Sequence, residues 1–316
     1  MGPDELVQIG YVASRYYRAG RSKIELAEEL GISRFKVSRL LEKATELGIV
    51  RIDITLPDAI DGELSNELRQ KFGLRRAIVV RAPSEEPEAL RNAIGCATAD
   101  LLPEVLKEGE LVGVAPGRTL LAATTCLTPL PHTDVVALCG ISNPSEEFST
   151  QVIMRLADAT DGTAWPIFAP FILPDPITAT SLRTESRIKA AFDLFGQVKT
   201  ALVSVGSWKP NDSQFYALAD SYGLAAELLS LGAVGEVCST VFAADGTIVP
   251  GLEDHTLSIS AEQLRAIPEV IGVAGGQGKT KAVLGAVRAG LINSLVTDSE
   301  LARQMISSIS DPPAAG

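Results

Sequence analysis

The sequence has few of the residues on which enzymes most often depend. Its 316 residues include 2 histidines and 4 cysteines, and only 5% of the residues are aromatic. The histidines are His132, which lies near prolines, and His255, which follows two acidic residues. General acid–base catalysis usually needs a pair of poised groups, often including histidine. We therefore expect both histidines to occupy solvated loops, and no catalytic residue is predicted.

The cysteines are also too dispersed for most cysteine chemistry. Cys96, Cys126, Cys139 and Cys238 lie far apart, show no CxxC spacing and fall within apolar segments. Such cysteines are more often buried thiols than metal ligands or disulfides. We expect four free thiols, no metal site and no cofactor.

No apolar run reaches the roughly 18 residues of a membrane span, and Asp4 and Glu5 do not suit a secretory signal. With 46% hydrophobic residues and a mean hydropathy of +0.20, the chain can bury a large core. The expectation is a soluble, cytoplasmic protein of about two domains without a membrane partner.

The segment from Lys23 to Glu42 has the pattern of a helix-turn-helix. Ser22 and Glu25 form a predicted capping box at the start of one helix, and Gly31 suits its left-handed end. Ser33 can cap the next helix, whose apolar residues recur at helical spacing. The predicted buried residues are Val37, Leu40, Leu41, Ala44 and Leu47. A surface helical hairpin with solvated charges is the alternative.

The outward face of the second helix carries groups that can contact DNA. Arginine can donate two hydrogen bonds to a guanine edge, and an exposed aromatic ring can meet a thymine methyl group. The candidate DNA-binding residues are Ser33, Arg34, Phe35, Lys36, Ser38, Arg39 and Glu42.

Flanking segments extend this DNA-binding domain. Residues 3–19 predict an opening helix, and Ile49–Ile54 alternates like the strand of a wing. From Arg15 to Arg51 the sequence has nine Lys and Arg and five Glu, which gives this segment a charge of +4. Since the net charge of the whole chain is −11, the remaining residues carry −15. A basic DNA-binding domain joined to an acidic domain would account for this charge asymmetry.

The rest of the chain alternates apolar strand-like runs with amphipathic helices. These runs begin at residues 77, 111, 135, 201, 270 and 292. Continuous apolar strands followed by helices predict a doubly wound, mainly parallel α/β domain. The expected boundaries are 1–56 for the winged helix-turn-helix, 57–75 for a linker with a short helix, and 76–316 for the effector and oligomerisation domain. The short helix, residues 63–72, could mediate self-association or dock on the next domain.

Ligands of open parallel sheets gather at the carboxyl ends of the strands. Three loops there contain glycine and small polar residues, at 113–119, 205–208 and 273–280. The first and third lead into helices, so their free N–H groups and cations could hold an anion. Ordinary strand-to-helix turns are the alternative. Gly278-Lys279-Thr280 resembles the end of a Walker A motif, but the spacing of the preceding glycine fails.

Two further residues suit sugar hydroxyls, Gln151 as an amide and Glu236 as a carboxylate acceptor. Either could instead be a structural hydrogen-bonding residue. The full set of candidate effector-binding residues is Gly117, Arg118, Thr119, Ser142, Gln151, Gly206, Ser207, Glu236, Gly275, Gly276 and Lys279.

Taken in order, these motifs resemble the SorC family of transcriptional regulators. The resemblance runs from about residue 10 to 306 and is carried by Tyr16-Tyr17, residues 113–120, 169–171, 205–207, 232–236 and 245–246, residues 274–279, and 295–298. It implies an effector domain similar to sugar isomerases and CoA transferases, operator DNA as partner, a homotetramer or dimer of dimers, and a phosphorylated sugar as effector. Gly117 and Thr119 would hold phosphate, Glu236 sugar hydroxyls, and Lys279 the anion.

The sequence departs from the family at two positions. Pro116 replaces a common aromatic residue, and Cys139 stands where some relatives have lysine, so imine formation with a sugar is unsupported. We therefore expect a regulator, most simply a repressor of a carbohydrate catabolic operon, and not an enzyme. The alternatives are a sugar-phosphate isomerase or deaminase with an accessory DNA-binding domain, and a DNA-binding protein without a ligand.

Overall fold

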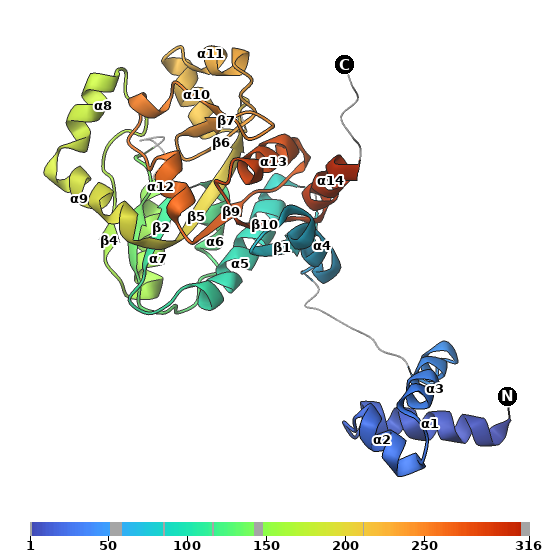
Figure 1. Ribbon diagram of the computed structural model, residues 1–316. Coiled ribbons are helices and arrows are strands. Elements are labelled where there is room, and N and C mark those ends of the chain that lie inside the picture. The colour runs from blue at the N-terminus through green and yellow to red at the C-terminus, as the bar shows by residue number, and fades with distance from the viewer. Residues whose placement is uncertain are drawn as a thin grey trace. The chain divides into compact units, whose positions relative to one another are not determined.

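The structure is a computed structural model that describes residues 2–50, 59–84, 86–115, 117–141, 148–210 and 212–310. The chain divides into two compact units, Met1–Thr55 and Leu56–Gly316 (Figure 1). In the described parts of the chain, no helix has both the length and the apolar character needed to cross a membrane.

The described residues of the N-terminal unit form the helices α1 (Pro3–Tyr17), α2 (Lys23–Leu30) and α3 (Arg34–Glu46). The predicted capping box is present: the Glu25 N–H donates to Ser22 Oγ over 3.2 Å, and the Ser22 N–H donates to Glu25 Oε2 over 2.8 Å. Gly31 ends α2 with a φ of 62°. Ser33 Oγ accepts the Lys36 N–H over 3.2 Å and so caps α3. The helix-turn-helix prediction is confirmed in its helices, turn and caps.

A small apolar core holds these three helices together. It is formed by Ile9, Val12, Ala13, Leu26, Val37, Leu40, Leu41 and Ala44. Leu47 was predicted to join it but is 44% exposed, because α3 ends at Glu46 and Leu47 is the C-cap. The predicted wing at 49–54 and the start of the predicted linker fall largely on residues 51–58, which lie outside the described residues.

The second unit is built on a sheet whose described strands follow the order β1-β10-β9-β5-β2-β3-β4, with every neighbouring pair parallel. These strands are β1 (Arg76–Val80), β2 (Leu111–Ala115), β3 (Asp134–Ala137), β4 (Ala164–Trp165), β5 (Val198–Ser207), β9 (Glu269–Val273) and β10 (Ser294–Asp298). The six predicted strands are confirmed, and so is the mainly parallel α/β fold.

An antiparallel extension that the sequence did not predict continues from the end of β5. It comprises β6 (Gly235–Val237), β7 (Thr240–Phe242) and β8 (Ile248–Val249), each paired to the one before. Strands of 2 or 3 residues carry too little periodicity to be recognised from sequence.

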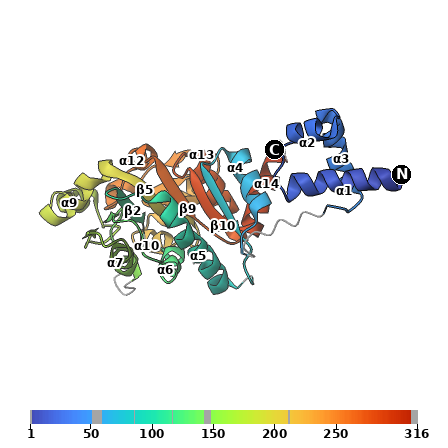
Figure 2. The same ribbon diagram turned by 90° about the horizontal axis from the view of Figure 1, so that it is seen from below.

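Helices cover both faces of the sheet, as a doubly wound fold requires. One layer contains α5 (Pro87–Val105), α6 (Arg118–Ala123) and α7 (Phe148–Thr160), and the other contains α4 (Gly62–Phe72), α13 (Thr280–Arg288) and α14 (Ser299–Ser310) (Figure 2). The remaining helices are α8 (Pro176–Arg183), α9 (Ser186–Leu194), η1 (Phe195–Gln197), α10 (Gln214–Ser221), α11 (Ala225–Ser230), η2 (Glu253–His255), α12 (Ala261–Ala266) and η3 (Gln277–Lys279).

Helix α4 docks on this unit, which is the second of its two predicted roles. It packs against β1 and α14, and Leu68 is completely buried. The Val79 N–H donates to Ser65 Oγ over 2.9 Å, which ties the helix to the edge strand. The predicted frayed tail, residues 311–316, lies outside the described residues.

The prediction of four free cysteines is wrong for one pair. Cys96 in α5 and Cys126 after α6 form a disulfide, with their Cα atoms 5.2 Å apart. Cys139 and Cys238 are free and buried, as predicted. The pair is 30 residues apart in sequence, and only the packing of α5 on α6 brings it together. Gly95 permits that packing, because a Cβ there would lie 2.7 Å from the Ala123 backbone nitrogen.

We therefore predict that Gly95→Ala destabilises the protein by about 1–3 kcal/mol, the usual cost of overpacking. Gly196→Ala is the matched control, since a Cβ at Gly196 meets nothing within 4 Å. Urea unfolding of both full-length variants measures the difference. An unchanged midpoint for Gly95→Ala would show that α5 and α6 can separate without cost.

Candidate functional site

A cavity of about 280 Å³ lies at the carboxyl ends of β2, β5 and β9. It is lined by Pro87, Leu90, Arg91, Ile94, Ala115, Gly117, Arg118, Thr119, Ser204, Val205, Gly206, Asp212, Ser213, Phe215, Glu236, Cys238, Gly275, Gly276, Gln277, Gly278 and Lys279. Pockets for small ligands usually measure roughly 300–1,000 Å³. This volume therefore suits a compact ligand.

Glu236 is a buried carboxylate within the cavity. It lies on β6 opposite Gly206 of β5 and is only 4% exposed. Its Oε1 accepts the Ser213 hydroxyl over 2.7 Å, whereas Oε2 has no hydrogen-bond partner among the described residues. A Cβ at position 206 would overlap the carboxylate as it lies in the structure, so the glycine leaves room for this conformation of Glu236.

Burial raises the pKa of Glu236 to about 7, although Ser213 and the charge of Lys279 act in the opposite direction. The ammonium group of Lys279 donates to the Val205 carbonyl over 2.9 Å. Burial lowers the pKa of Lys279, and the neighbouring charge of Glu236 opposes that shift. A carboxylate and an ammonium group therefore share the cavity, each perturbed mainly by desolvation.

The loop before Lys279 is held by side chains from other strands. Asp298, at the end of β10, accepts the Gly276 N–H at Oδ2 over 2.8 Å. Its Oδ1 accepts the N–H groups of Glu300 and Leu301, both over 3.0 Å. Ser207 Oγ donates to the Gly278 carbonyl over 3.2 Å. These bonds fix the backbone that presents Lys279.

The opposite wall is formed by the start of α6. Gly117 is the residue before that helix and packs directly on Ser204, leaving no room for a Cβ. Ser204 Oγ is buried without a hydrogen-bond partner in the described residues. A polar hydroxyl without a partner beside a helix start is a natural contact for a polar ligand.

The structure brings most of the predicted effector residues together. Those lining the cavity are Gly117, Arg118, Thr119, Gly206, Glu236, Gly275, Gly276 and Lys279. Ser207 is not a lining residue, but its hydroxyl donates to the Gly278 carbonyl of the loop before Lys279. Gln151 lies in α7 and is not among the lining residues. Ser142 and Pro116 lie outside the described residues.

Sequence reasoning missed several lining residues, chiefly Arg91, Ser204, Asp212, Ser213 and Phe215. Ser204 directly precedes Val205-Gly206 and could have been found from that loop. The others lie within or just before helices, away from any glycine motif, and carried no comparable signal.

Neither histidine lines the cavity. His132 is exposed, as predicted, but His255 is partly buried, with its Nδ1 3.2 Å from the Leu173 carbonyl oxygen. A group of three or more potential metal ligands is not found among the described residues. The polar groups present can hold an anion together with hydroxyl groups.

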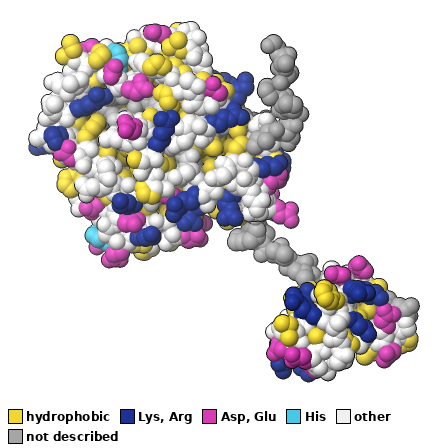
Figure 3. All heavy atoms as spheres, viewed as in Figure 1, with side chains coloured by type: hydrophobic (Ala, Val, Ile, Leu, Met, Phe, Trp, Pro, Cys, Tyr) yellow, Lys and Arg dark blue, Asp and Glu magenta, His cyan; other side chains and the backbone are white. Residues whose placement is uncertain are grey.

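In the N-terminal unit, α3 presents its predicted DNA-binding face to solvent. Phe35 is 80% exposed, and Arg34, Lys36, Arg39 and Glu42 are also exposed, while Ser38 is partly buried. On the face shown in Figure 3, Lys and Arg side chains alternate with acidic ones over this unit.

The raised pKa of Glu236 predicts a pH-dependent stability. Between its ordinary value of 4.5 and its folded value of about 7, the folded state holds the proton that the unfolded state has lost. Rising pH therefore destabilises the fold across that window, by on the order of 3 kcal/mol. The control is Glu236→Gln, which cannot ionise. The wild type's free energy of unfolding, minus that of the variant, should fall between pH 4.5 and 7, and a constant difference would contradict the shift.

Comparison with known proteins now identifies the family. Residues 60–307 match the family model described as "Putative sugar-binding domain". The chain is 30% identical to the transcriptional regulator LsrR of Klebsiella pneumoniae, over 97% of this chain and 94% of that protein. It is 28% identical to the deoxyribonucleoside regulator of Bacillus subtilis, over 96% of this chain and 99% of that protein.

The fold agrees with these matches. The crystal structure of the full-length sorbitol operon regulator SorC from Klebsiella pneumoniae superposes with a TM-score of 0.73 at 27% identity, covering 96% of this chain and 99% of that one. Together, the sequence matches over nearly the whole chain and this shared architecture place the protein in the SorC family of sugar-binding transcriptional regulators.

Proposed function

We propose that this protein is a cytoplasmic, DNA-binding repressor of a carbohydrate catabolic operon, controlled by a phosphorylated sugar in the cavity of its second unit. The observation that carries the proposal is that Oε2 of buried Glu236 has no hydrogen-bond partner among the described residues and lies in the same cavity as Lys279 and Arg118. A sugar supplies hydroxyl donors for the first group, and its phosphate supplies negative charge for the other two.

The phosphate would bind between the start of α6 and the loop before α13. The two segments contribute backbone N–H groups, the Thr119 hydroxyl and the cations Arg118 and Lys279 to one cavity. Anions are favoured at such helix starts, because the free N–H groups point toward them. The sugar end would then face Glu236, whose bond to Ser213 orients the open carboxylate oxygen.

Operator DNA would be read by α3. The exposed Arg34 and Arg39 can each donate two hydrogen bonds to a guanine edge, and Phe35 can contact a thymine methyl group. Ser33 is occupied as the helix cap, so it fits a phosphate contact better than base reading. Lys36, Ser38 and Glu42 complete the exposed or partly exposed surface of α3.

The proposed regulator acts as a homotetramer whose paired α3 helices meet two halves of an operator. A ligand can shift such an assembly only if it binds one arrangement more tightly than another. The sugar phosphate would favour the arrangement that cannot hold both half-sites, and repression would end.

Fluorescence anisotropy with DNA from the gene's upstream region, at fixed salt and with a sugar-phosphate panel, tests this scheme. Catalytic turnover of a panel member would favour an enzyme instead.

Arg39→Ala should weaken binding to the specific operator by about 1–3 kcal/mol and relax the preference at one base position. The guanidinium is removed from an exposed site, so the fold should remain intact. Competition binding against operators mutated at each position measures both effects. Arg187→Ala, at an exposed arginine of α9, is the control. An unchanged base preference in Arg39→Ala would remove Arg39 from the readout.

Lys279→Ala should abolish the effect of the sugar phosphate on DNA binding while leaving operator affinity unchanged. The lysine supplies a cation inside the cavity, whereas Lys281, two residues later, is exposed on α13. Lys281→Ala therefore makes the same chemical change outside the site. Anisotropy titrations of both variants give the comparison. A response that survives in Lys279→Ala would mean that the anion binds elsewhere.

A further inference from the structure

We propose that Cys96 and Cys126 form a reversible redox-modification site that adjusts the effector cavity. A hydroperoxide would oxidise the two thiols and a dithiol reductant would restore them. The disulfide state would bind the effector more tightly than the dithiol state. The oxidation site stands on the cysteine pair alone, whereas its effect on ligand affinity rests on the function proposed above.

The two cysteines of this pair differ from the other two in accessibility. Cys96 and Cys126 are each partly exposed, so a small oxidant or reductant can reach them. Cys139 and Cys238 are buried, and burial raises the pKa of Cys139 to about 12. Because the thiolate is the reactive form, the buried pair should stay reduced under conditions that convert the exposed pair.

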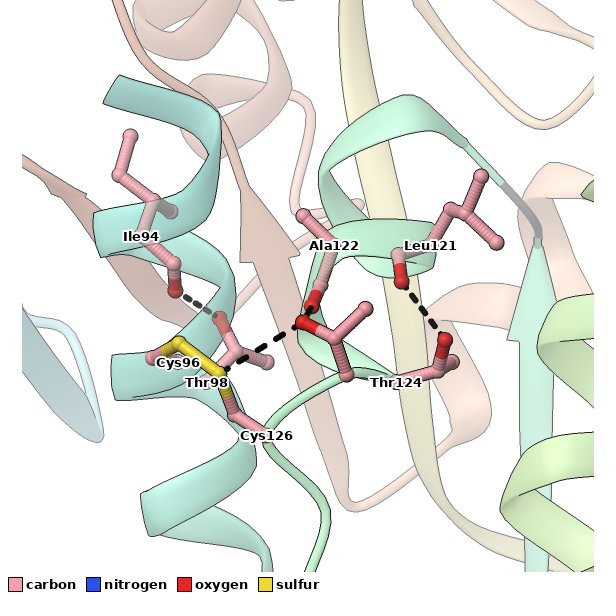
Figure 4. The surroundings of a disulfide bond; sticks show 8 residues. Ile94, Cys96, Thr98, Leu121, Ala122, Thr124 and Cys126 are labelled. Atoms are coloured by element: carbon pink, nitrogen blue, oxygen red, sulfur yellow. Dashed lines mark hydrogen bonds between the residues drawn. A yellow bond between two sulfur atoms is a disulfide. The ribbon is translucent and has the colours of Figure 1, made fainter. Parts of the chain in front are cut away.

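The disulfide joins α5 to the turn after α6 (Figure 4), and both helices contribute residues to the cavity lining. On one side, α5 contributes Leu90, Arg91 and Ile94 to the lining, and Cys96 follows two residues after Ile94. On the other, α6 begins at Arg118, a lining residue, and Cys126 lies in the turn that ends it. Both walls therefore continue directly into the bridged cysteines.

The polypeptide around Cys126 keeps its shape through bonds that do not involve the disulfide. The Cys126 N–H donates to the Ala123 carbonyl over 3.0 Å, and the Thr125 hydroxyl donates to the Ala122 carbonyl over 2.7 Å. Arg155 of α7 donates to Thr124 Oγ1 over 3.2 Å. Reduction should therefore loosen the contact between α5 and α6 at its Cys96–Cys126 end, while the Gly95 contact keeps the helices packed and the turn stays folded.

The chemistry balances with a hydroperoxide as oxidant. One thiolate attacks the peroxide oxygen, forms a sulfenic acid and releases the alcohol or water. The second thiol then attacks that sulfur, the S–S bond forms, and water leaves. In the reverse direction a dithiol donates two electrons through a mixed disulfide and becomes a disulfide itself. Each cycle oxidises and reduces the same two sulfur atoms.

The effect on binding follows from preorganisation. A cavity whose walls are already rigid loses less conformational entropy when a ligand binds. The disulfide state should therefore bind the ligand more tightly than the dithiol state. We expect at least about a fivefold difference in the dissociation constant between the two states, the lower end of typical coupling between sites.

The first experiment establishes the site. Full-length protein is treated with hydrogen peroxide or with dithiothreitol, then alkylated under denaturing conditions and analysed by peptide mass spectrometry. Oxidised protein should show one Cys96–Cys126 bridge with Cys139 and Cys238 alkylated, and reduced protein should show four alkylated cysteines. A bridge that fails to form, or involves other cysteines, overturns the proposal.

The second experiment tests the coupling and separates it from the proposed function. Hydrogen exchange of peptides from α5 and the start of α6 should be faster in the reduced state, with α12 as the unaffected reference. Calorimetry with glucose 6-phosphate, ribose 5-phosphate and inorganic phosphate then compares affinities. If none binds in either state, the effector assignment fails. Equal exchange in the two states, or equal affinity for a probe that does bind, overturns the cavity coupling.

Cys126→Ser provides the matched control. It removes the bridge while keeping a small polar side chain in the same turn, so it should behave like reduced protein whether or not peroxide is present. Cys139→Ser should retain the wild-type difference between the two redox states. A peroxide response that persists in Cys126→Ser would assign the effect to a different residue.

Discussion

A carboxylate confined with one unsatisfied oxygen is the constraint on which the cavity depends. An unpartnered buried polar group costs about 1–3 kcal/mol, and in the part of the chain that the structure describes Oε2 of Glu236 is such a group. The surrounding structure reduces the cost through the Ser213 hydroxyl and the charge of Lys279, and partial protonation reduces it further. A ligand hydroxyl at Oε2 would satisfy the remaining oxygen. Because binding would remove the free-energy cost of that unsatisfied oxygen, it would strengthen the affinity for the ligand.

The same chain meets two kinds of phosphate in the proposed function, and it uses cations differently for each. The arginines of α3 are exposed, so their attraction to DNA is long-ranged and strongly screened by salt. Lys279 is held within the cavity and hydrogen-bonded to a carbonyl, where screening is weaker. DNA recognition can therefore respond steeply to ionic strength while effector recognition changes little.

Local patterns in the sequence were sufficient for much of this molecule. Continuous apolar runs located the parallel strands, and the Ser22–Glu25 capping box with Gly31 located the helix-turn-helix. The same strand-end argument placed Lys279 and Gly117 in one cavity. Features that depend on contacts between distant segments were not predictable in this way. Arg91 lines the cavity because of the way α5 packs on the sheet and on α6, and the Cys96–Cys126 bridge depends on the contact with α6.

The pairing of Gly206 with Glu236 also has an evolutionary consequence. A Cβ at position 206 would overlap the carboxylate as it lies in the structure, so an alanine or serine there requires the Glu236 side chain either to move or to be replaced. Replacement of Glu236 by a smaller residue removes this overlap and makes alanine or serine at position 206 easier to accommodate. Once such a residue occupies position 206, a glutamate restored at position 236 would have to adopt a different conformation, so a change of effector at this site would be harder to reverse.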